Sequence, residues 1–283
     1  MLELRTLLLA TDLGPDSVPA FAHTRFLAEQ FGARLILYHA VPVPEHRYPH
    51  WAFAHGHEVW MSAERHARAE LERQAEGLTC PYELAVERRS SPLDGILDMI
   101  RSREPDLTIL GTHGREGLAH LMVGSVAEDV VQRSLGPILC VPPRAIEAAG
   151  PYRRILVPTD FSEASRGAFP IAAFLARKFA AEVVALHVVS PARLGTLEPL
   201  PPDLGAGTEE TLREFFREHF DGLDVLPSVR TGHVWERIAH GALSLSNGLV
   251  VMSTRGHDSF SDRILGSNTE RVIRHAPCPV LVA

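Results

Sequence analysis

The chain is 283 residues long, 45% of its residues are apolar, and its formal net charge is −7. This composition suffices for two cores of ordinary domain size, and the negative charge argues against a nucleic-acid binder that relies on a basic surface. No apolar run is long enough to span a membrane, and residues 1–14 are too acidic and too soon interrupted for a signal peptide. We expect a cytoplasmic protein without a nucleic-acid or membrane partner.

Short apolar runs alternate with helical patterns along the first half of the chain. The runs at 4–11 and 34–41 are predicted to be buried strands on either side of an amphipathic helix at 16–31. A long polar stretch follows, with a helical pattern near 61–76. Further along we expect a strand at 82–87, a helix at 91–102, a strand at 106–111, a glycine loop, a helix from Ser125 and a last strand at 137–141.

The second half repeats the first. Asp12 and Asp160 each follow an apolar run and lie 148 residues apart, as do His39 and His187. The glycine loops that come later lie 142 residues apart, so the second copy is six residues shorter. Because the period is the size of a domain, it indicates a duplicated domain and not a solenoid.

The chain is therefore expected to form two domains. A Pro-, Gly- and Ala-containing stretch at 142–152 is typical of a linker, so we place the domains at 1–145 and 151–283. Short apolar strands separated by helices indicate parallel sheets covered on both faces, and right-handed crossovers make such sheets doubly wound. We predict an α/β protein with two tandem, five-stranded, Rossmann-like parallel sheets. In such sheets, ligands bind beyond the carboxyl ends of the strands.

A glycine pattern follows the fourth strand of each half. Residues 111–125 are GTHGREGLAHLMVGS and residues 253–267 are STRGHDSFSDRILGS, with nine residues between an inner glycine and a Gly-Ser pair that precedes a helical pattern. Glycine lets the backbone approach a ligand closely, and free N–H groups at a helix N-terminus attract an anion. The pattern predicts phosphate sites at Gly111, Gly114, Gly124 and Ser125, and at Gly256, Gly266 and Ser267.

Two further features bear on the predicted ligand. Asp12 and Asp160 stand at the end of the first strand of each half, where a carboxylate suits a ribose hydroxyl or an adenine amine. A second interpretation competes with the nucleotide. Each helix-starting serine has a glutamate three residues later, as in Ser125-x-x-Glu128, and such a capping box by itself explains a serine there. The identical nine-residue spacing in matching contexts favours a nucleotide.

These residues resemble the universal stress protein family, and the resemblance covers both halves. The family motif, G-x-x-G, nine residues and G-[ST], is complete in the first half, whereas the second half has Ser253 in place of the first glycine. The resemblance implies that Asp12 and Asp160 are the family's nucleotide-contacting aspartates and that the backbone at Ala40 and Val188 contacts adenine. It also implies a cytoplasmic stress-response protein that binds ATP, together with Mg²⁺, often as a dimer.

Each half departs once from the family pattern. The family often has a glycine at the end of the third strand, which is Gly232 in the second half but Ser90 in the first. Gly111 lies where the backbone approaches the nucleotide most closely, and its counterpart Ser253 carries a side chain there. We therefore expect the first site to bind nucleotide more tightly than the second.

The last strands are expected to join the two halves. Edge strands need cover, and related single domains dimerise, an arrangement that duplication makes intramolecular. We predict an internal pseudo-dimer formed through residues 137–141 and 279–283. The sequence leaves open whether the whole chain forms a homodimer and which protein partner it has.

Other clusters of reactive side chains are weaker indications. Six histidines lie within 39–66, and His55 and His57 offer two metal ligands, but without cysteine or a clear helical i, i+4 pair we predict no metal site. His39 and His187 end core strands and are expected to be structural. The three cysteines are not at metal spacing, so we expect reduced thiols.

Three functions are compatible with this sequence: an ATP-binding regulatory protein with little or slow hydrolysis, an ATP-using enzyme of adenylating or phosphotransferase type, and a scaffold that has lost nucleotide binding. The enzyme lacks its motifs, because there is no P-loop, nucleophile elbow or kinase signature. Lys178 is the only lysine, so no lysine clamp can recur in both sites. The repeated glycines argue against the scaffold. We favour the regulatory protein and assign no catalytic residue.

Overall fold

The computed structural model describes residues 2–43, 50–112, 124–190, 202–245, 247–254 and 265–283. The first half contains β1 (Thr6–Ala10), α1 (Val18–Phe31), β2 (Arg34–Pro42), α2 (His50–Ala75), β3 (Tyr82–Arg89), α3 (Pro92–Arg103), β4 (Leu107–Gly111), α4 (Ser125–Arg133) and β5 (Ile138–Val141). The second half contains β6 (Arg154–Thr159), α5 (Phe169–Phe179), β7 (Glu182–Val189), α7 (Pro202–Arg217), β8 (Val225–Thr231), α8 (Val234–Leu243), β9 (Gly248–Met252), α9 (Ser267–His275) and β10 (Val280–Val282).

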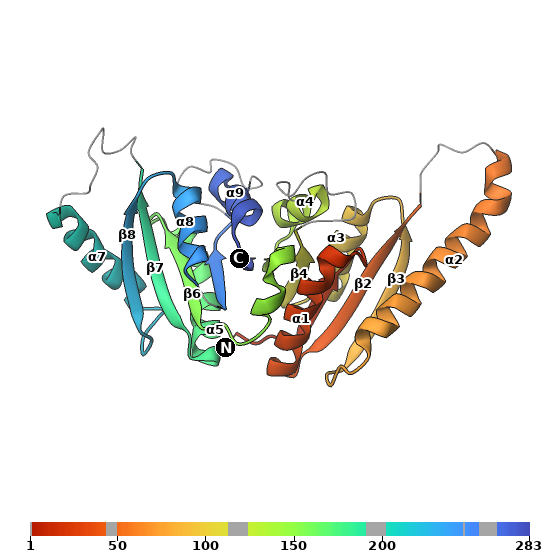
Figure 1. The fold of residues 1–283 in the computed structure, drawn as a ribbon, viewed down its shortest axis with the longest axis horizontal. Coiled ribbons are helices and arrows are strands. Elements are labelled where there is room, and N and C mark those ends of the chain that lie inside the picture. Colours follow the sequence, from red (N-terminus) through yellow and green to blue (C-terminus); the bar gives the residue numbers. More distant parts are fainter. Residues whose placement is uncertain (1, 44–49, 113–123, 191–201, 246, 255–264) are drawn as a thin grey trace.

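The described strands form one ten-stranded sheet in the order β3-β2-β1-β4-β5-β10-β9-β6-β7-β8 (Figure 1). Within each half the five strands are parallel, which confirms the predicted fold class. The halves meet where β10 runs antiparallel to β5, with Val280 opposite Cys140 and Val282 opposite Ile138. Each half therefore has its own parallel sheet, and one antiparallel strand pair makes the two sheets continuous.

Two apolar cores cover the two faces of this sheet. Because successive strand residues point to opposite faces, Leu7 and Leu9 of β1 belong to one core and Leu8 and Ala10 to the other. The first core includes buried residues of α1, α2, α5 and α7, and the second includes those of α3, α4, α8 and α9. Both cores contain residues from the two halves, so the apolar interior does not stop at the junction.

Aromatic side chains pack α1 against α5 across the junction. Phe31 stacks on Phe174 with ring centroids 5.4 Å apart. The buried Tyr152, just before β6, meets Phe26 and Phe179 edge to face at 6.4 Å and 5.6 Å. Aromatic pairs of this geometry add to the free energy gained from burying their area, so this cluster stabilises the contact between the halves.

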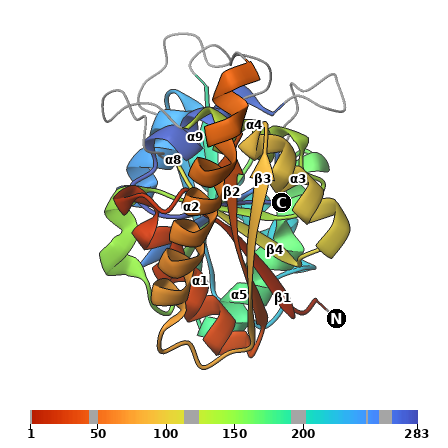
Figure 2. The ribbon, with the colours of Figure 1, turned by 90° about the vertical axis from the view of Figure 1, so that its right-hand side faces the viewer.

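Two segments are more helical than their sequences predict. Helix α2 begins at His50, well before the helical pattern near 61–76, and it lies along the outer side of β2 and β3 (Figure 2). Helix α7 begins at Pro202, although the Pro- and Gly-rich run before residue 211 favours a loop. Proline suits the first turn of a helix, and fully buried Leu212 and Phe216 anchor α7 on the sheet. Tertiary packing thus overrides the weak helix propensity of glycine.

No helix among the described residues is both long and apolar enough to cross a membrane. The 26-residue helix α2 has the length but carries charges along it, including Glu64, Arg65 and Glu70.

Helices α1 and α5 end in the same backbone conformation but with different residues. Gly32 (φ 62°) and Ala180 (φ 50°) are both left-handed, a conformation that favours glycine by about 1 kcal/mol. We expect Ala180→Gly to raise the free energy of unfolding by about 1 kcal/mol and Gly32→Ala to lower it by about as much. Urea denaturation measures both. A Cβ at Gly32 would meet nothing within 4 Å, so the expected loss comes from the backbone conformation alone. A gain in stability for Gly32→Ala, or a loss for Ala180→Gly, would contradict this account.

Buried His23 of α1 links the two halves and should make stability depend on pH. Its Nε2 lies 3.0 Å from the carbonyl oxygen of Ala145 and its Nδ1 lies 3.2 Å from the hydroxyl of Tyr152. Burial lowers the pKa of His23 from 6.5, and the Ala145 hydrogen bond opposes that shift. The unfolded chain therefore binds this proton more readily, so stability is lost as pH falls below about 6.5.

We expect His23→Gln to reduce the loss of thermal stability between pH 7 and pH 5. Glutamine still donates to Ala145 and accepts from Tyr152 but does not titrate. Calorimetric melting of both proteins at each pH makes the comparison, and identical pH slopes would show that His23 does not contribute. The difference in melting temperature between the two proteins above pH 7 measures any loss of packing caused by the substitution itself.

Candidate functional site

The carboxyl ends of the central strands bring the predicted residues of each half to one edge of the sheet. In the first half Ala10 of β1 pairs with Tyr38 of β2 and with Leu110 of β4. Asp12 and Ala40 therefore follow at this edge, and Gly111 ends β4 there. The second half repeats the arrangement around β6, and α4 and α9 lie at the same edge of the molecule (Figure 1).

The turn after the first strand of each half is held by a repeated hydrogen-bond pattern. In the first half, Asp12 Oδ1 accepts the backbone N–H of Gly14 at 2.9 Å, and Thr11 Oγ1 accepts that of Leu13 at 3.0 Å. Thr11 also donates to Ser17 Oγ at 3.0 Å. These bonds fix the direction in which the Asp12 carboxylate leaves the strand, so the position of the carboxylate depends on Thr11 and Ser17 as well.

The second half has the same turn with different residues. Asp160 Oδ1 accepts the backbone N–H of Ser162 at 3.0 Å, and Thr159 Oγ1 accepts that of Phe161 at 3.0 Å. The hydroxyls of Thr159 and Ser165 lie 2.8 Å apart. The threonine and serine partners were missed in the sequence, although the Thr-Asp pair at the end of both first strands was a visible signal.

Both turns contain a non-glycine residue in the left-handed region. Leu13 has φ 62° and Phe161 has φ 63°. Such conformations cost free energy for bulky residues and persist where surrounding contacts enforce them, often at functional sites. Phe161 is held by the rings of His187 and Phe215, at centroid distances of 4.5 Å and 5.4 Å.

His39 and His187 tie the end of the second strand to the end of the first. His39 Nδ1 lies 2.8 Å from the carbonyl oxygen of Thr11, and His187 Nδ1 lies 2.9 Å from that of Thr159. A carbonyl only accepts, so Nδ1 carries the proton in each ring. Both histidines therefore support the aspartate turns, which is the structural role that their positions predict.

The N-termini of α4 and α9 have no side-chain cap. The N-cap residues are Gly124 (φ −58°, ψ 132°) and Gly266 (φ −60°, ψ 135°), and neither helix has a side-chain capping hydrogen bond among the described residues. Ser125 and Ser267 are instead the first helical residues. The capping-box alternative is therefore wrong, and no described side chain caps the first backbone N–H groups of either helix, which are the groups that can bind an anion.

The glutamates of the rejected capping boxes have another partner. Arg274 of α9 lies 2.9 Å from Glu270 of its own helix and 3.5 Å from Glu128 of α4. A carboxylate in the first turn repels an anion at the helix N-terminus, and one guanidinium offsets both carboxylates. The two candidate phosphate sites are therefore electrostatically connected across the junction.

One backbone hydrogen bond joins the two ends of each glycine loop. Gly124 donates to the carbonyl of Thr112 at 2.6 Å, and Gly266 donates to that of Thr254 at 3.0 Å. The inner glycines Gly114 and Gly256 lie outside the described residues. Gly111 pairs with Val141 in the sheet, and its counterpart Ser253 is buried at the end of β9, where its carbonyl accepts from Thr269 at 3.2 Å.

The halves differ most at the end of the third strand and the start of the next helix. Gly232 has φ 134°, and a Cβ there would lie 2.5 Å from Arg237 Nε, so glycine makes room for this arginine of α8. In the first half the corresponding helix position is Gly95, where a Cβ would lie 2.2 Å from the Tyr38 hydroxyl. The Tyr38–Gly95 pair of the first half is replaced by Leu186 and Arg237 in the second.

Tyr38 is fully buried beneath α3, and its hydroxyl has no hydrogen-bond partner of good geometry among the described residues. Burial, followed by the charge of Glu87, raises its pKa to about 12, while nearby Arg89 opposes the shift. The phenol therefore stays protonated at physiological pH.

The remaining clusters do not form a metal centre in the part of the chain that the structure describes. No group of three or more His, Cys, Asp or Glu side chains is arranged to hold an ion there. The side chains of His46, His50, His55 and His57 lie outside the described set. Cys140 and Cys278 are buried free thiols in the core, and burial raises the pKa of each to about 12.

Comparison with known proteins bears on these features. The model of the universal stress protein family matches the chain twice, at residues 3–142 and 151–283. The chain belongs to the universal stress protein family. Its two matches make it a tandem member, in which each half carries one copy of the family domain.

Relatives of this chain share modest identity. A universal stress protein of Mycobacterium tuberculosis is 24% identical over 243 residues, which cover 80% of this chain and 81% of that protein. One from Methanocaldococcus jannaschii is 33% identical over 146 residues, covering 46% of this chain and 81% of the relative. A crystal structure of a universal stress protein from Archaeoglobus fulgidus superposes with a TM-score of 0.70 at 19% identity, covering 100% and 98% of the two chains.

The His39 hydrogen bond provides a test of how the aspartate turn is held. We expect His39→Ala to lower the free energy of unfolding by about 1–2 kcal/mol, because the buried side of the turn loses a donor to the Thr11 carbonyl. His39→Asn, whose amide can place a donor near the position of Nδ1, should recover part of that loss. Urea denaturation of the three proteins decides, and equal stability of His39→Ala and the unaltered protein would show that the bond contributes nothing.

Proposed function

We propose that this protein is an ATP-binding universal stress protein that acts as a regulatory module in the cytoplasmic stress response. The observation that carries the proposal is the pair of helix N-termini with glycine as N-cap and no cap from a described side chain, at the sheet edge that holds Asp12 and Asp160. Backbone N–H groups and the positive end of the helix dipole match a phosphate chain. Family membership supports the same reading of these residues.

In this proposal each half has a nucleotide site of the same design. In the first half the phosphates face Gly111, Gly114, Gly124 and Ser125, and the ribose and base face Asp12 and Ala40. In the second half the phosphates face Gly256, Gly266 and Ser267, and the ribose and base face Asp160 and Val188. Gly232, where the first half has Ser90, also belongs to the second site. Mg²⁺ enters bound to the phosphate oxygens, which it prefers as ligands, and neutralises part of their charge.

The first half is proposed to be the tighter ATP site. Its glycine motif is complete, whereas the second half has buried Ser253 where the first has Gly111. The two halves act as an internal pseudo-dimer, supported by the antiparallel pairing of β5 with β10. This arrangement places both sites in one chain, so signalling to a protein partner does not require a second copy.

Slow turnover is proposed because the sequence has no P-loop or kinase signature and has only one lysine. The only lysine of the chain, Lys178, lies on α5 near Phe31, 5.1 Å from that ring. Catalysis of phosphoryl transfer relies on such cations and on an oriented base. We expect turnover no faster than about one per minute, against about 10 per second for a typical enzyme.

Substitution of the N-cap glycines tests the proposal. Gly124→Asp should supply the missing cap and also place a carboxylate where the phosphate is expected. We therefore expect unchanged or slightly raised stability but affinity for ATP at the first site reduced more than about tenfold. Calorimetric titration with ATP and Mg²⁺, together with thermal melting, measures both effects.

Gly124→Ala is the matched control, since alanine adopts the same backbone angles without adding a charge or a cap. It should bind ATP more tightly than Gly124→Asp does. Absence of binding by the unaltered protein at millimolar ATP would refute the proposal, and turnover near the typical enzymatic rate would favour an ATP-using enzyme instead.

A further inference from the structure

The edge strands of the two halves carry opposite charges at the same register position. In the first half Ala40 of β2 lies opposite Glu87 of β3, and in the second half Val188 of β7 lies opposite Arg230 of β8. The two positions are equivalent, because His39 pairs with Val86 just as His187 pairs with Val229. Ala40 and Val188 are the residues given to the base in the proposed function, so the inverted charges lie at the base end of each site.

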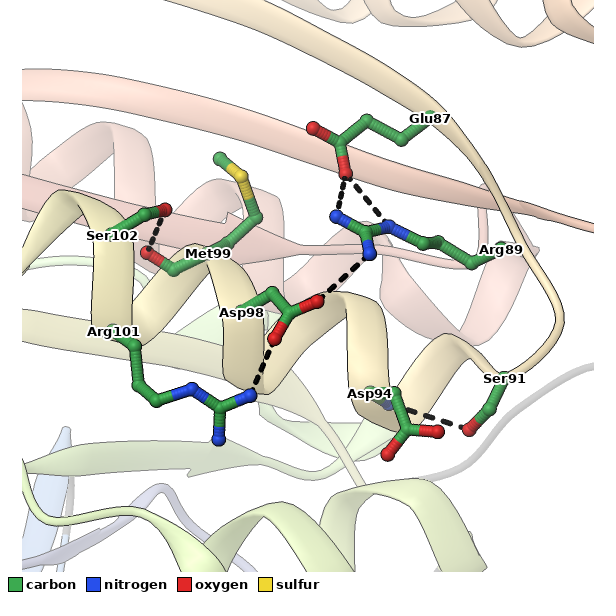
Figure 3. Close-up of polar contacts among 8 residues, drawn as sticks. All are labelled: Glu87, Arg89, Ser91, Asp94, Asp98, Met99, Arg101 and Ser102. Carbon is green, nitrogen blue, oxygen red and sulfur yellow. Dashed lines mark hydrogen bonds and ion pairs between the residues drawn. The ribbon is translucent and has the colours of Figure 1, made fainter.

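The first half presents a hydrogen-bond acceptor at this point. Glu87 Oε2 accepts from both Nε and Nη2 of Arg89, at 3.0 Å and 2.7 Å, while Arg89 Nη1 donates to Asp98 at 2.8 Å (Figure 3). Asp98 in turn pairs with Arg101. The guanidinium of Arg89 is thus committed to two carboxylates, and Glu87 Oε1 takes part in none of these contacts. A carboxylate oxygen can only accept when ionised.

The second half presents donors at the equivalent point. Arg230 is exposed, and Arg237 of α8 donates from Nε to the carbonyl of Thr231 at 2.6 Å. Gly232 leaves room for the Arg237 guanidinium against the backbone. Within the described part of the chain no carboxylate forms an ion pair with either arginine. A guanidinium carries five N–H donors and no acceptor, so these two side chains can only donate.

The six-position of a purine distinguishes these two environments. Adenine presents an amino group there, which donates, whereas guanine presents O6 beside N7, and both accept. Arginine pairs with O6 and N7 of guanine through two parallel bonds, but it faces the amino group of adenine donor to donor. Carboxylates show the converse preference for an amino group.

We propose that the two halves select purines of opposite hydrogen-bonding pattern, adenine at the first site through Glu87 and guanine at the second through Arg230 and Arg237. The proposal rests on the proposed nucleotide-binding function and refines it, because the second half then holds a guanine nucleotide and not a weakly bound ATP. Glu87, Arg230 and Arg237 are specificity-determining residues in this account and take no part in holding the phosphates.

Each site is measured alone in a full-length chain whose other site carries the aspartate substitution. In Gly124→Asp the second site remains, and calorimetric titration should show GTP binding about tenfold more tightly than ATP. In Gly266→Asp the first site remains and should prefer ATP. Adding Arg230→Ala and Arg237→Ala to Gly124→Asp should abolish the preference for GTP.

Arg213→Ala is the control for loss of positive charge, because Arg213 lies on α7 of the same half and pairs with Glu210 at 3.3 Å. It should leave the GTP-to-ATP ratio of the second site unchanged. An equal ratio at the two sites, or a second-site preference that survives the double arginine substitution, would overturn the base assignment while leaving nucleotide binding intact. Failure of the unaltered protein to bind either nucleotide would instead refute the proposed function itself.

Discussion

The antiparallel pairing of β5 with β10 is the constraint on which the arrangement of this protein depends. Both strands are short, Ile138–Val141 and Val280–Val282, and all their residues are buried. Alone, each would be the exposed edge of a five-stranded sheet, with unpaired backbone groups and an apolar surface. Pairing satisfies those groups and lets the cores on both faces continue from one half into the other.

This junction also affects the electrostatics of the two candidate phosphate sites. Because β5 and β10 are neighbours, the helices that precede them, α4 and α9, come close enough for Arg274 to reach Glu128 as well as Glu270. The position equivalent to Arg274 in the first half is Gln132, so one guanidinium serves both helix N-termini. A contact between the halves thus offsets carboxylate charge at both candidate phosphate sites.

Much of the fold follows from local sequence. The alternation of apolar strands with helices, repeated at a domain-sized period, predicts two parallel sheets, and Gly32 ends α1 as helix signals predict. The first turns of α7 could not be predicted, because the run before residue 211 contains prolines and glycines that favour a loop. Buried Leu212 and Phe216, further along α7, anchor the helix on the sheet.

The candidate site could be predicted only in part, for a related reason. The glycine spacing and the aspartates locate it, but the same letters also match a capping box. Gly124 takes the cap position, and Glu128 finds its partner 146 residues away in Arg274, a contact that no local pattern encodes. The exchange of Tyr38 and Gly95 for Leu186 and Arg237 could not be predicted either, because it depends on which side chains contact each other in the folded protein.

The short linker, η2 (Pro143–Ala148), has an evolutionary consequence. In a homodimer made from one gene, every substitution occurs in both subunits, and a change that improves one site is imposed on the other. Covalent duplication removes that coupling, because residues such as Glu87 and Arg230 occupy equivalent places yet are encoded separately. The protein is in this respect equivalent to an obligate heterodimer with fixed one-to-one stoichiometry. Its halves can diverge in function, and two identical halves cannot pair by mistake.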